Sequence, residues 1–468
     1  MTTTPLTTAA SGPPASPYVT GLFAPVLDEV DAEDLVIHGE LPEAIRGSYY
    51  RNGANTPYTP PTPWTYPIDG DGMVHEMAIS EGRAHYRNRF VRTPMIEAEL
   101  AAKKALWATM MGGAMPLGEV PEELKFTPKD LPDVNIVRHD GRLLALAETT
   151  RSYCLDPTTL ATLGPETWDG AYPMGHTAHP KIDPVTGEMI LFAYTFAEPY
   201  LTWAVIGADG SVVQPPTGVA GFDATYMIHD CAITERYLLL LVNPAVFTLD
   251  EMMKGGSPLQ WQPERGSRTV LVPRDGSAPI WLDADRVSWC WHIANAYDSA
   301  DEVVVDWVRW DHLQVVDQVA ENLGALVRTT LRPSAGTTST EVLHEGLMEF
   351  PRIDDRLVGQ RHSRIAMGAK SGRPGLIPGE FDSVLTIRPD TGEATVFDGG
   401  DLVVGEPCFV PDPEAEGWFV TFGTDRTTLR SSFIVLPAED VSAGPIARVD
   451  LPVRVPNGLH GAWAPTAG

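Results

Sequence analysis

The chain has 468 residues and a formal net charge of −28, with 62 acidic and 34 basic side chains. This balance argues against a nucleic-acid partner, whose phosphates need a basic surface, and against binding of anionic lipid through a basic face. A neutral or apolar partner fits the composition better.

The N-terminal residues 1–17 are rich in Thr, Ala and Pro, and they carry neither a positively charged side chain nor an apolar core. They are therefore predicted to be a disordered lead rather than a signal peptide. The longest apolar run, residues 237–242, is far shorter than the ~20 residues that span a bilayer. We expect a cytoplasmic protein.

Short apolar or alternating runs, separated by turn residues, recur along the chain from Gly21 onward and predict strands. Examples are residues 34–38, 142–146, 189–193, 303–306 and 418–422. Asp-Gly and Pro-rich segments between them favour hairpins, and the 42 glycines and 42 prolines suit a protein with many turns. The sequence predicts an all-β fold, although no strict repeat marks the blades of a regular propeller.

The clearest helical pattern covers residues 96–111, where Ile96, Leu100, Trp107 and either Met110 or Met111 fall on one face. This pattern predicts a helix packed on the β core. A second interpretation is that its Met-rich end lines an apolar substrate entrance, because Met adapts well to apolar binding surfaces.

Four of the 12 histidines are candidate metal ligands because each stands in an apolar or turn setting next to a predicted strand. These are His179, His229, His292 and His460. A closed β structure could bring such widely separated residues to its axis, and four imidazoles suit a divalent transition metal without separating Fe, Zn, Cu and Ni. His176 lies three residues before His179, a spacing that on a strand puts the two side chains on opposite faces.

Three glutamates in apolar contexts are candidates to accept the outer ring N–H of such histidines: Glu148, Glu349 and Glu406. A carboxylate in such a setting is costly unless it is paired. The four cysteines form no CxxC pair, so a thiolate metal site is not predicted. Esterase, dinucleotide-binding and phosphoryl-transfer motifs are absent from the sequence.

Several motifs in order along nearly the whole chain resemble the signatures of the carotenoid cleavage oxygenase family: residues 47–53, 69–75, 86–93, 178–181, 349–352, 405–407 and 460–461. The resemblance implies a seven-bladed β-propeller with a helical cap over the metal face. It implies one catalytic domain over residues 18–468, with the helical cap segment at about residues 94–128.

The resemblance also assigns the chemistry. An Fe(II) ion would be held by His179, His229, His292 and His460, with Glu148, Glu349 and Glu406 behind three of them. The family cleaves a C=C bond with O2 to give two carbonyl products and needs no organic cofactor.

Within the family, the sequence motifs are most similar to those of the bacterial branch that cleaves lignostilbenes and isoeugenol. Three substrate-pocket positions nevertheless differ from that branch. Ala147 stands where that branch has a lysine that helps hold a phenol oxygen, and Met110 aligns with its tyrosine. Val134 replaces a common threonine near the metal. We therefore expect a more apolar conjugated alkene, a carotenoid or apocarotenoid.

Two alternatives stay open. One is an aryl-alkene or stilbene oxygenase that anchors its substrate differently, and the other is a propeller that binds or isomerises an apolar ligand without O2. An apolar stretch at residues 106–115 could give weak contact with a membrane surface, contact between subunits, or simple core packing.

Overall fold

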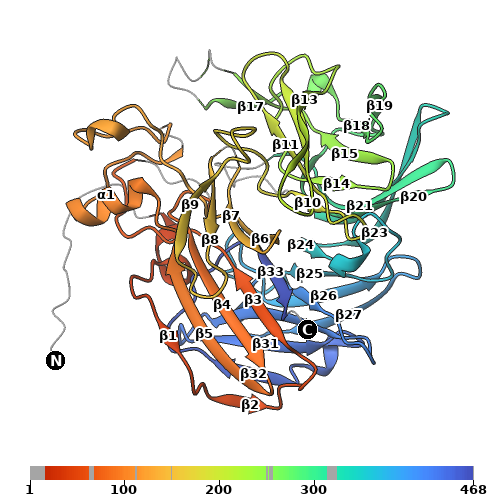
Figure 1. The fold of residues 1–468 in the computed structure, drawn as a ribbon. Helices are drawn as coiled ribbons and strands as arrows, with labels where there is room; N and C mark the ends of the chain where they lie inside the picture. Colours follow the sequence, from red (N-terminus) through yellow and green to blue (C-terminus); the bar gives the residue numbers. More distant parts are fainter. Residues whose placement is uncertain are drawn as a thin grey trace.

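Seven antiparallel sheets are arranged as blades around a common axis in the computed structural model of the chain (Figure 1). The structure describes residues 16–62, 68–110, 113–148, 150–248, 251, 257–313 and 324–466. The predicted seven-bladed β-propeller is confirmed. Residues 1–15 of the predicted N-terminal lead lie outside the described residues.

The first four blades follow the chain, apart from the last strand of blade 1. Blade 1 contains β1 (Asp31–Ala32), β5 (Arg83–Phe90), β4 (Met73–Ser80), β3 (Gly47–Arg51) and β33 (Gly461–Pro465). Blade 2 contains β6 (Asn135–His139), β7 (Arg142–Leu146), β8 (Ser152–Leu155) and β9 (Thr162–Glu166). Blade 3 contains β10 (Lys181–Ile182), β11 (Met189–Tyr194), β12 (Leu201–Ile206) and β13 (Val212–Gly218). Blade 4 contains β14 (Cys231–Ile233), β15 (Tyr237–Val242), β18 (Arg268–Pro273) and β19 (Ile280–Asp283).

The remaining three blades complete the ring. Blade 5 contains β20 (Trp289–Ser299), β21 (Glu302–Trp310), β22 (Gly324–Arg332) and β23 (Thr337–Glu345). Blade 6 contains β24 (Met348–Arg352), β25 (Ile365–Ala369), β26 (Ser383–Arg388) and β27 (Glu393–Asp398). Blade 7 contains β2 (Ile37–Gly39), β32 (Ala447–Asp450), β31 (Ser431–Pro437), β30 (Trp418–Asp425), β28 (Leu402–Val404) and β29 (Cys408–Val410). A separate hairpin pairs β16 (Ala245–Phe247) with β17 (Leu259–Trp261).

The strand β15 shows why inner blade strands are apolar on both faces. Alternate side chains of a strand point to opposite faces of the sheet. Leu238 and Leu240 pack in a cluster with blade 3, whereas Leu239 and Leu241 pack in a cluster with blade 5. The apolar run in the sequence therefore reflects a strand buried between two neighbouring blades.

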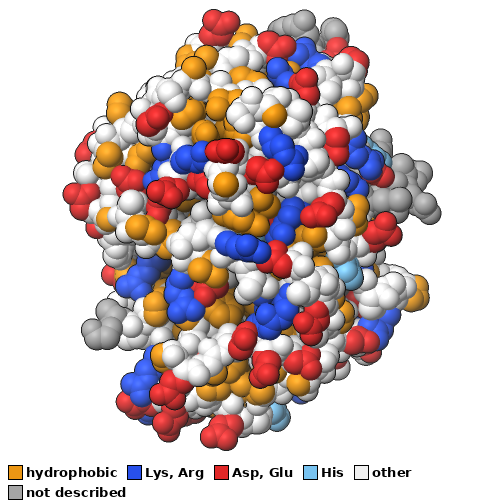
Figure 2. Space-filling model, turned by 90° about the vertical axis from the view of Figure 1, so that its right-hand side faces the viewer, with side chains coloured by type: hydrophobic (Ala, Val, Ile, Leu, Met, Phe, Trp, Pro, Cys, Tyr) orange, Lys and Arg blue, Asp and Glu red, His pale blue; other side chains and the backbone are white. Residues whose placement is uncertain are grey.

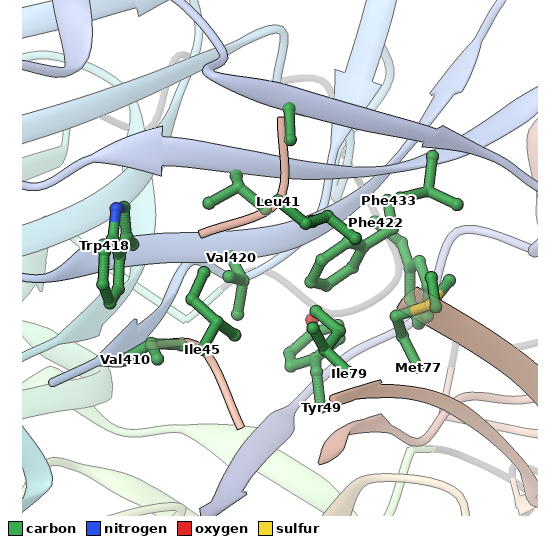
Figure 3. Close-up of a cluster of buried hydrophobic side chains, with 14 of the residues drawn as sticks. Leu41, Ile45, Tyr49, Met77, Ile79, Val410, Trp418, Val420, Phe422 and Phe433 are labelled. Atoms are coloured by element: carbon green, nitrogen blue, oxygen red, sulfur yellow. The ribbon is translucent and has the colours of Figure 1, made fainter. Parts of the chain in front are cut away.

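The ring closes without a covalent link where the two ends of the chain meet. β33, from the C-terminal end, pairs with β3, and β2, from the N-terminal part, pairs with β32. Between blades 1 and 7 a buried apolar cluster packs Tyr49, Met77, Phe422 and Phe433 together (Figure 3). Burial of apolar area is worth roughly 25 cal/mol per Å², so this seam stabilises the closed ring.

Among its described residues the helical cap segment contains one α-helix, α1 (Pro94–Ala102), which lies outside the blades (Figure 1), where Ile96 packs against Met73 and Phe90 of blade 1. The helix begins at Thr93, whose hydroxyl accepts the N–H of Ile96 at 3.2 Å. It ends at Lys103, which adopts the left-handed conformation with φ of 53°. The helix predicted for residues 96–111 is therefore too long, because the chain turns away after Ala102; Met111 lies outside the described residues.

No helix in the described ranges is both long and apolar enough to cross a bilayer. On the face shown in Figure 2, acidic and basic side chains are interspersed with apolar ones.

Candidate metal centre

The four candidate histidines stand at the beginnings of inner strands in four different blades. His179 and His229 precede β10 and β14, His292 lies near the start of β20, and His460 directly precedes β33. The inner strands contact one another around the axis, as β14 does with β20 and β20 with β24. Residues at their starts therefore meet at one end of the axis.

The four imidazoles form one buried cluster. The four residues are between 3% and 8% exposed, and one ligand atom from each lies within 4.8 Å of the others. Nε2 of His179 is 3.1 Å from Nε2 of His229, and Nε2 of His292 is 3.1 Å from Nε2 of His460. The structure thus brings together the four residues that the sequence singled out.

Each of three histidines has a glutamate behind it. Nδ1 of His229 lies 2.6 Å from Glu148, and Nδ1 of His292 lies 2.6 Å from Glu349. Nδ1 of His460 lies 2.9 Å from Glu406. A carboxylate in this place fixes the ring orientation and makes the opposite nitrogen more basic.

These seven side chains come from seven different blades. Glu148 follows β7, Glu349 lies in β24, and Glu406 precedes β29, so blades 2, 6 and 7 supply the carboxylates. Blades 1, 3, 4 and 5 supply the histidines. The centre therefore depends on closure of the whole ring.

The donor set fits a divalent metal ion. A neutral histidine that donates its Nδ1–H to a carboxylate presents a bare lone pair on Nε2. The Nε2 atoms of His292 and His460 face each other at 3.1 Å, an arrangement that a cation bound to both would stabilise. Imidazole binds zinc at about 2.0–2.1 Å, so one ion can be reached by both nitrogens.

The protonation of the cluster supports this interpretation. Burial lowers the pKa of His179 and of His292 well below the ordinary value, and the neighbouring imidazoles lower both further. Neutral imidazoles are the form that binds a metal ion.

The outer oxygens of the three glutamates have different partners. Glu148 accepts the hydroxyl of Tyr194, and Glu349 accepts the indole N–H of Trp310. Glu406 accepts Arg352 at 3.1 Å and the backbone N–H of Gly461 at 2.8 Å. Sequence reasoning missed Tyr194 and Trp310; Arg352 lay in the quoted motif at residues 349–352 without an assigned role.

The pKa values of Glu349 and Glu406 differ because the two buried carboxyls have different partners. Burial raises the pKa of Glu349 to about 8, and none of the described Lys or Arg side chains is paired with it. Burial also disfavours the charged form of Glu406, but the Arg352 charge, His460 and the Gly461 N–H outweigh it and hold the pKa at about 2. A cation among the four imidazoles would favour the ionised form of both.

His176, the close neighbour of His179, belongs to a different environment. Its Nε2 lies 2.7 Å from the Ser152 hydroxyl and its Nδ1 lies 2.7 Å from the carbonyl oxygen of Thr177. Its ring packs edge-on against Trp168 at 4.9 Å. His176 is therefore held in the core of blades 2 and 3 rather than in the metal cluster.

The three predicted pocket positions fall in two places. Val134 and Ala147 are buried, at 4% and 3% exposure, in one apolar cluster with Phe350. The ring of Phe350 lies 5.4 Å from His292 and 5.1 Å from His460. Met110 lies in the cap and is 38% exposed.

An aromatic surface leads away from His229 toward the outside. Trp291 packs edge-on against His229 at 5.1 Å and against Trp289 at 5.0 Å. The two tryptophans share an apolar cluster with Phe247, which lies 5.7 Å from Phe196. Phe196 is 56% exposed, so the aromatic surface extends from the metal cluster to solvent.

A cavity of about 280 Å³ lies on the axis against His179, His292 and His460. It is lined by the inner strands and by charged residues, among them Lys181, which pairs with Asp230 at 2.7 Å. Val134, Ala147 and Met110 do not line it. The axial cavity thus touches three of the histidines, whereas the aromatic residues pack against the fourth, His229.

Comparisons with known proteins agree with this architecture. A sequence model of the family described as retinal pigment epithelial membrane protein matches residues 23–465. A carotenoid 9,10(9',10')-cleavage dioxygenase of Crocus sativus is 32% identical over 485 residues, covering 95% of this chain and 88% of the relative. Resveratrol cleavage oxygenase 1 of Aspergillus fumigatus is 31% identical over 490 residues and is covered over 96% of its length, as is this chain.

Among solved structures, the crystal structure of a lignostilbene dioxygenase from Pseudomonas brassicacearum is similar with a TM-score of 0.87 and 28% identity. The similarity covers 97% of this chain and 99% of the other. The chain therefore belongs to the carotenoid cleavage oxygenase family, whose members are oxygenases that cleave C=C bonds at a four-histidine iron site.

Proposed function

We propose that the protein is an Fe(II)-dependent oxygenase that cleaves a C=C bond of an extended apolar alkene, a carotenoid or apocarotenoid, with O2 to give two carbonyl products. The observation that carries the substrate class is the aromatic surface from His229 through Trp291 and Phe247 to the exposed Phe196. Its members carry no charge, and aromatic faces suit a long conjugated chain.

The four histidines would hold the iron. When bound, the iron would supply the site for O2, and the conjugated alkene would supply the electrons that reduce O2 as the C=C bond is converted into two C=O bonds. Glu148, Glu349 and Glu406 hold three of the imidazoles in their orientation, because each carboxylate accepts the Nδ1–H of one ring. The apolar cluster of Val134, Ala147 and Phe350 keeps water away from one side of the centre.

The pocket positions support an apolar substrate. Val134, Ala147 and Met110 bring no ionisable group, so they cannot bind or deprotonate a phenol. Tyr194, which lies on the aromatic surface against Phe247 at 5.6 Å, has its hydroxyl committed to Glu148. A phenolic substrate would therefore lack a polar partner among these residues.

Cleavage of a stilbene or another aryl alkene is the second candidate. It is favoured by the relative named for resveratrol and by the similar structure of a lignostilbene dioxygenase. Such a substrate would need an anchor other than positions 147 and 110.

The test compares substrates on the iron-loaded protein. An apocarotenal, isoeugenol and a 4-hydroxystilbene are each incubated with the protein in air, and the aldehydes are identified by mass spectrometry. We expect the apocarotenal to give cleavage products at the highest kcat/KM. Cleavage of the phenolic substrates alone would contradict the proposal and favour the second candidate.

A third outcome concerns the reaction rather than the substrate. An isomerase or a binding protein would change or retain the alkene without consuming O2. Loss of the apocarotenal without oxygen uptake would therefore contradict both oxygenase candidates.

A further inference from the structure

A buried ionic cluster joins the cap segment to the propeller. Nζ of Lys129 lies 2.9 Å from a carboxylate oxygen of Asp71 and 2.7 Å from one of Glu99. The exposed fractions of these side chains are 5%, 1% and 0%. Buried charges are costly even when paired, so a cluster with one cation and two carboxylates is weak evidence for stability and calls for a geometric role.

Glu99 holds the chain that leaves the cap helix. One of its carboxylate oxygens accepts the backbone N–H groups of Leu106 at 2.8 Å and Trp107 at 3.2 Å. Hydrogen bonds to a charged acceptor are stronger than neutral ones. The path of the chain toward Met110 is therefore fixed by the same side chain that binds Lys129.

Lys129 lies where the cap returns to blade 2. Its backbone N–H bonds to the carbonyl oxygen of Ala114 at 2.8 Å, and the indole N–H of Trp107 bonds to the carbonyl oxygen of Thr127 at 2.9 Å. The two ends of the cap segment are thus held together around the ionic cluster.

Asp71 belongs to a loop of blade 1 that contacts both the cap and the edge of the metal site. Asp69 in this loop accepts the backbone N–H of Met110 at 2.8 Å. The N–H of Gly70 bonds to Asp133 at 3.3 Å, and the next residue, Val134, accepts the N–H of His460 at 3.1 Å. The loop at residues 69–71 therefore lies between Met110 and Val134.

We propose that Glu99, Lys129 and Asp71 are positioning residues that fix the cap segment at residues 106–110 on the propeller and so hold Met110 in its place in the cap. The inference rests on the proposed function, because Met110 is one of the proposed substrate-pocket positions. The three residues have no hydrogen bond to the four histidines or their glutamates within the described part of the chain, and they act through the backbone of the cap.

Two variants test the cluster: one leaves buried charges unpaired, and the other removes all of its charges. Lys129→Met leaves two buried carboxylates without their cation, whereas the triple variant Asp71→Asn, Glu99→Gln, Lys129→Met is neutral throughout. Gln at position 99 keeps an oxygen that can accept N–H groups. Lys125→Met is the matched control, because Lys125 lies in the same segment, is 53% exposed and pairs with Glu122 at the surface.

The first readout is amide hydrogen exchange, which needs no activity. We expect exchange at residues 103–110 to be faster by about tenfold or more in Lys129→Met, the size of one lost charge-assisted hydrogen bond. Exchange in the blades and iron content should match the wild type. In the triple variant, which has no unpaired buried charge, the same local increase should persist, and Lys125→Met should show none.

The second readout is the split between KM and kcat for the alkene on the full iron-loaded chain. We expect KM to rise about tenfold at nearly unchanged kcat in both cluster variants, as when binding is weakened equally before and during reaction. Unchanged exchange at residues 103–110, or an increase spread equally through the blades, would overturn the positioning role. A wild type that cleaves no alkene would instead overturn the proposed function, and the exchange result would still decide whether the cluster fixes the cap.

Discussion

The metal centre and the cap are held in place in opposite ways. The centre takes one side chain from each of the seven blades, and every histidine position is fixed by an inner strand. The cap is one stretch of chain with a nine-residue helix, attached through Glu99, Lys129 and a loop of blade 1. The ring therefore determines which reaction is possible, whereas the cap can change without moving the metal ligands.

This difference predicts the largest effect for a metal ligand. His229→Ala removes one of four imidazoles and leaves Glu148 without its imidazole partner, so we expect complete loss of bound iron and of activity. Elemental analysis of the purified variant after iron loading is the measurement. His176→Gln is the control, because His176 is buried three residues before His179 but bonds to Ser152 and Thr177 instead. Full iron content in His229→Ala would refute the assignment.

A substitution of one glutamate at the same centre should reduce iron binding and activity less than loss of a histidine. Glu148→Gln keeps a hydrogen-bond acceptor for His229 but loses the charge, and we expect iron affinity or activity to fall by roughly 10–100-fold. The readout is iron titration with a competing chelator. Tyr194→Phe should have a smaller effect, since it removes only the hydroxyl that bonds to Glu148. Equal effects of the two variants would mean that the charge of Glu148 is unimportant.

The apolar cluster provides a test of substrate choice. Ala147→Lys adds an amine beside Val134, and we expect the ratio of kcat/KM for a 4-hydroxystilbene over an apocarotenal to rise about tenfold or more, within the range that a pocket contact can discriminate. Iron content should not change. Ala147→Met is the control for volume without charge. The same shift in both variants would show that size rather than polarity selects the substrate.

The smallest expected effect comes from the ionic cluster of the cap. Burial raises the pKa of Asp71 to about 6, against the opposing charge of Lys129. A carboxyl with a raised folded-state pKa binds its proton more tightly in the folded protein. The contribution of Asp71 to the free energy of unfolding is therefore favourable below the pKa of 3.8 in the unfolded chain. This contribution is lost as the pH rises through about 6, the pKa in the folded protein.

The corresponding measurement compares urea unfolding of wild type and Asp71→Asn between pH 4 and pH 7. We expect the free energy of unfolding of the wild type to fall relative to that of the variant as the pH rises toward 6, by at most ~1.4 kcal/mol per pH unit for one proton. Asp31→Asn, at an exposed ion pair of blade 1, is the control and should leave this pH window unchanged. A constant difference between wild type and Asp71→Asn would contradict the pKa of Asp71.

Much of the ring could be predicted from the sequence because its signals are local. Apolar runs between turn residues predicted strands, and the seven-bladed propeller implied by the motifs is confirmed. The histidines and glutamates stood next to predicted strands, where the structure now brings them together. The end of the cap helix could not be predicted, because the apolar pattern continues to Met110 while Glu99 binds the N–H groups of Leu106 and Trp107.

The longer-range contacts had no signal in the sequence. The aromatic surface combines residues 196, 247 and 289–291 from three segments, and only the ring places them side by side. The ionic cluster joins residues 71, 99 and 129. These residues are so far apart in the sequence that neither strand nor helix periodicity could predict their contact.

The central claim is that the four-histidine centre uses O2 to cleave an alkene. Its most direct test is simultaneous measurement of oxygen uptake and aldehyde formation by the iron-loaded protein with an apocarotenal. We predict that oxygen uptake tracks substrate loss and product formation in the wild type and that His229→Ala shows neither. Loss of the apocarotenal without oxygen uptake, or equal oxygen-dependent cleavage by His229→Ala, would contradict the account.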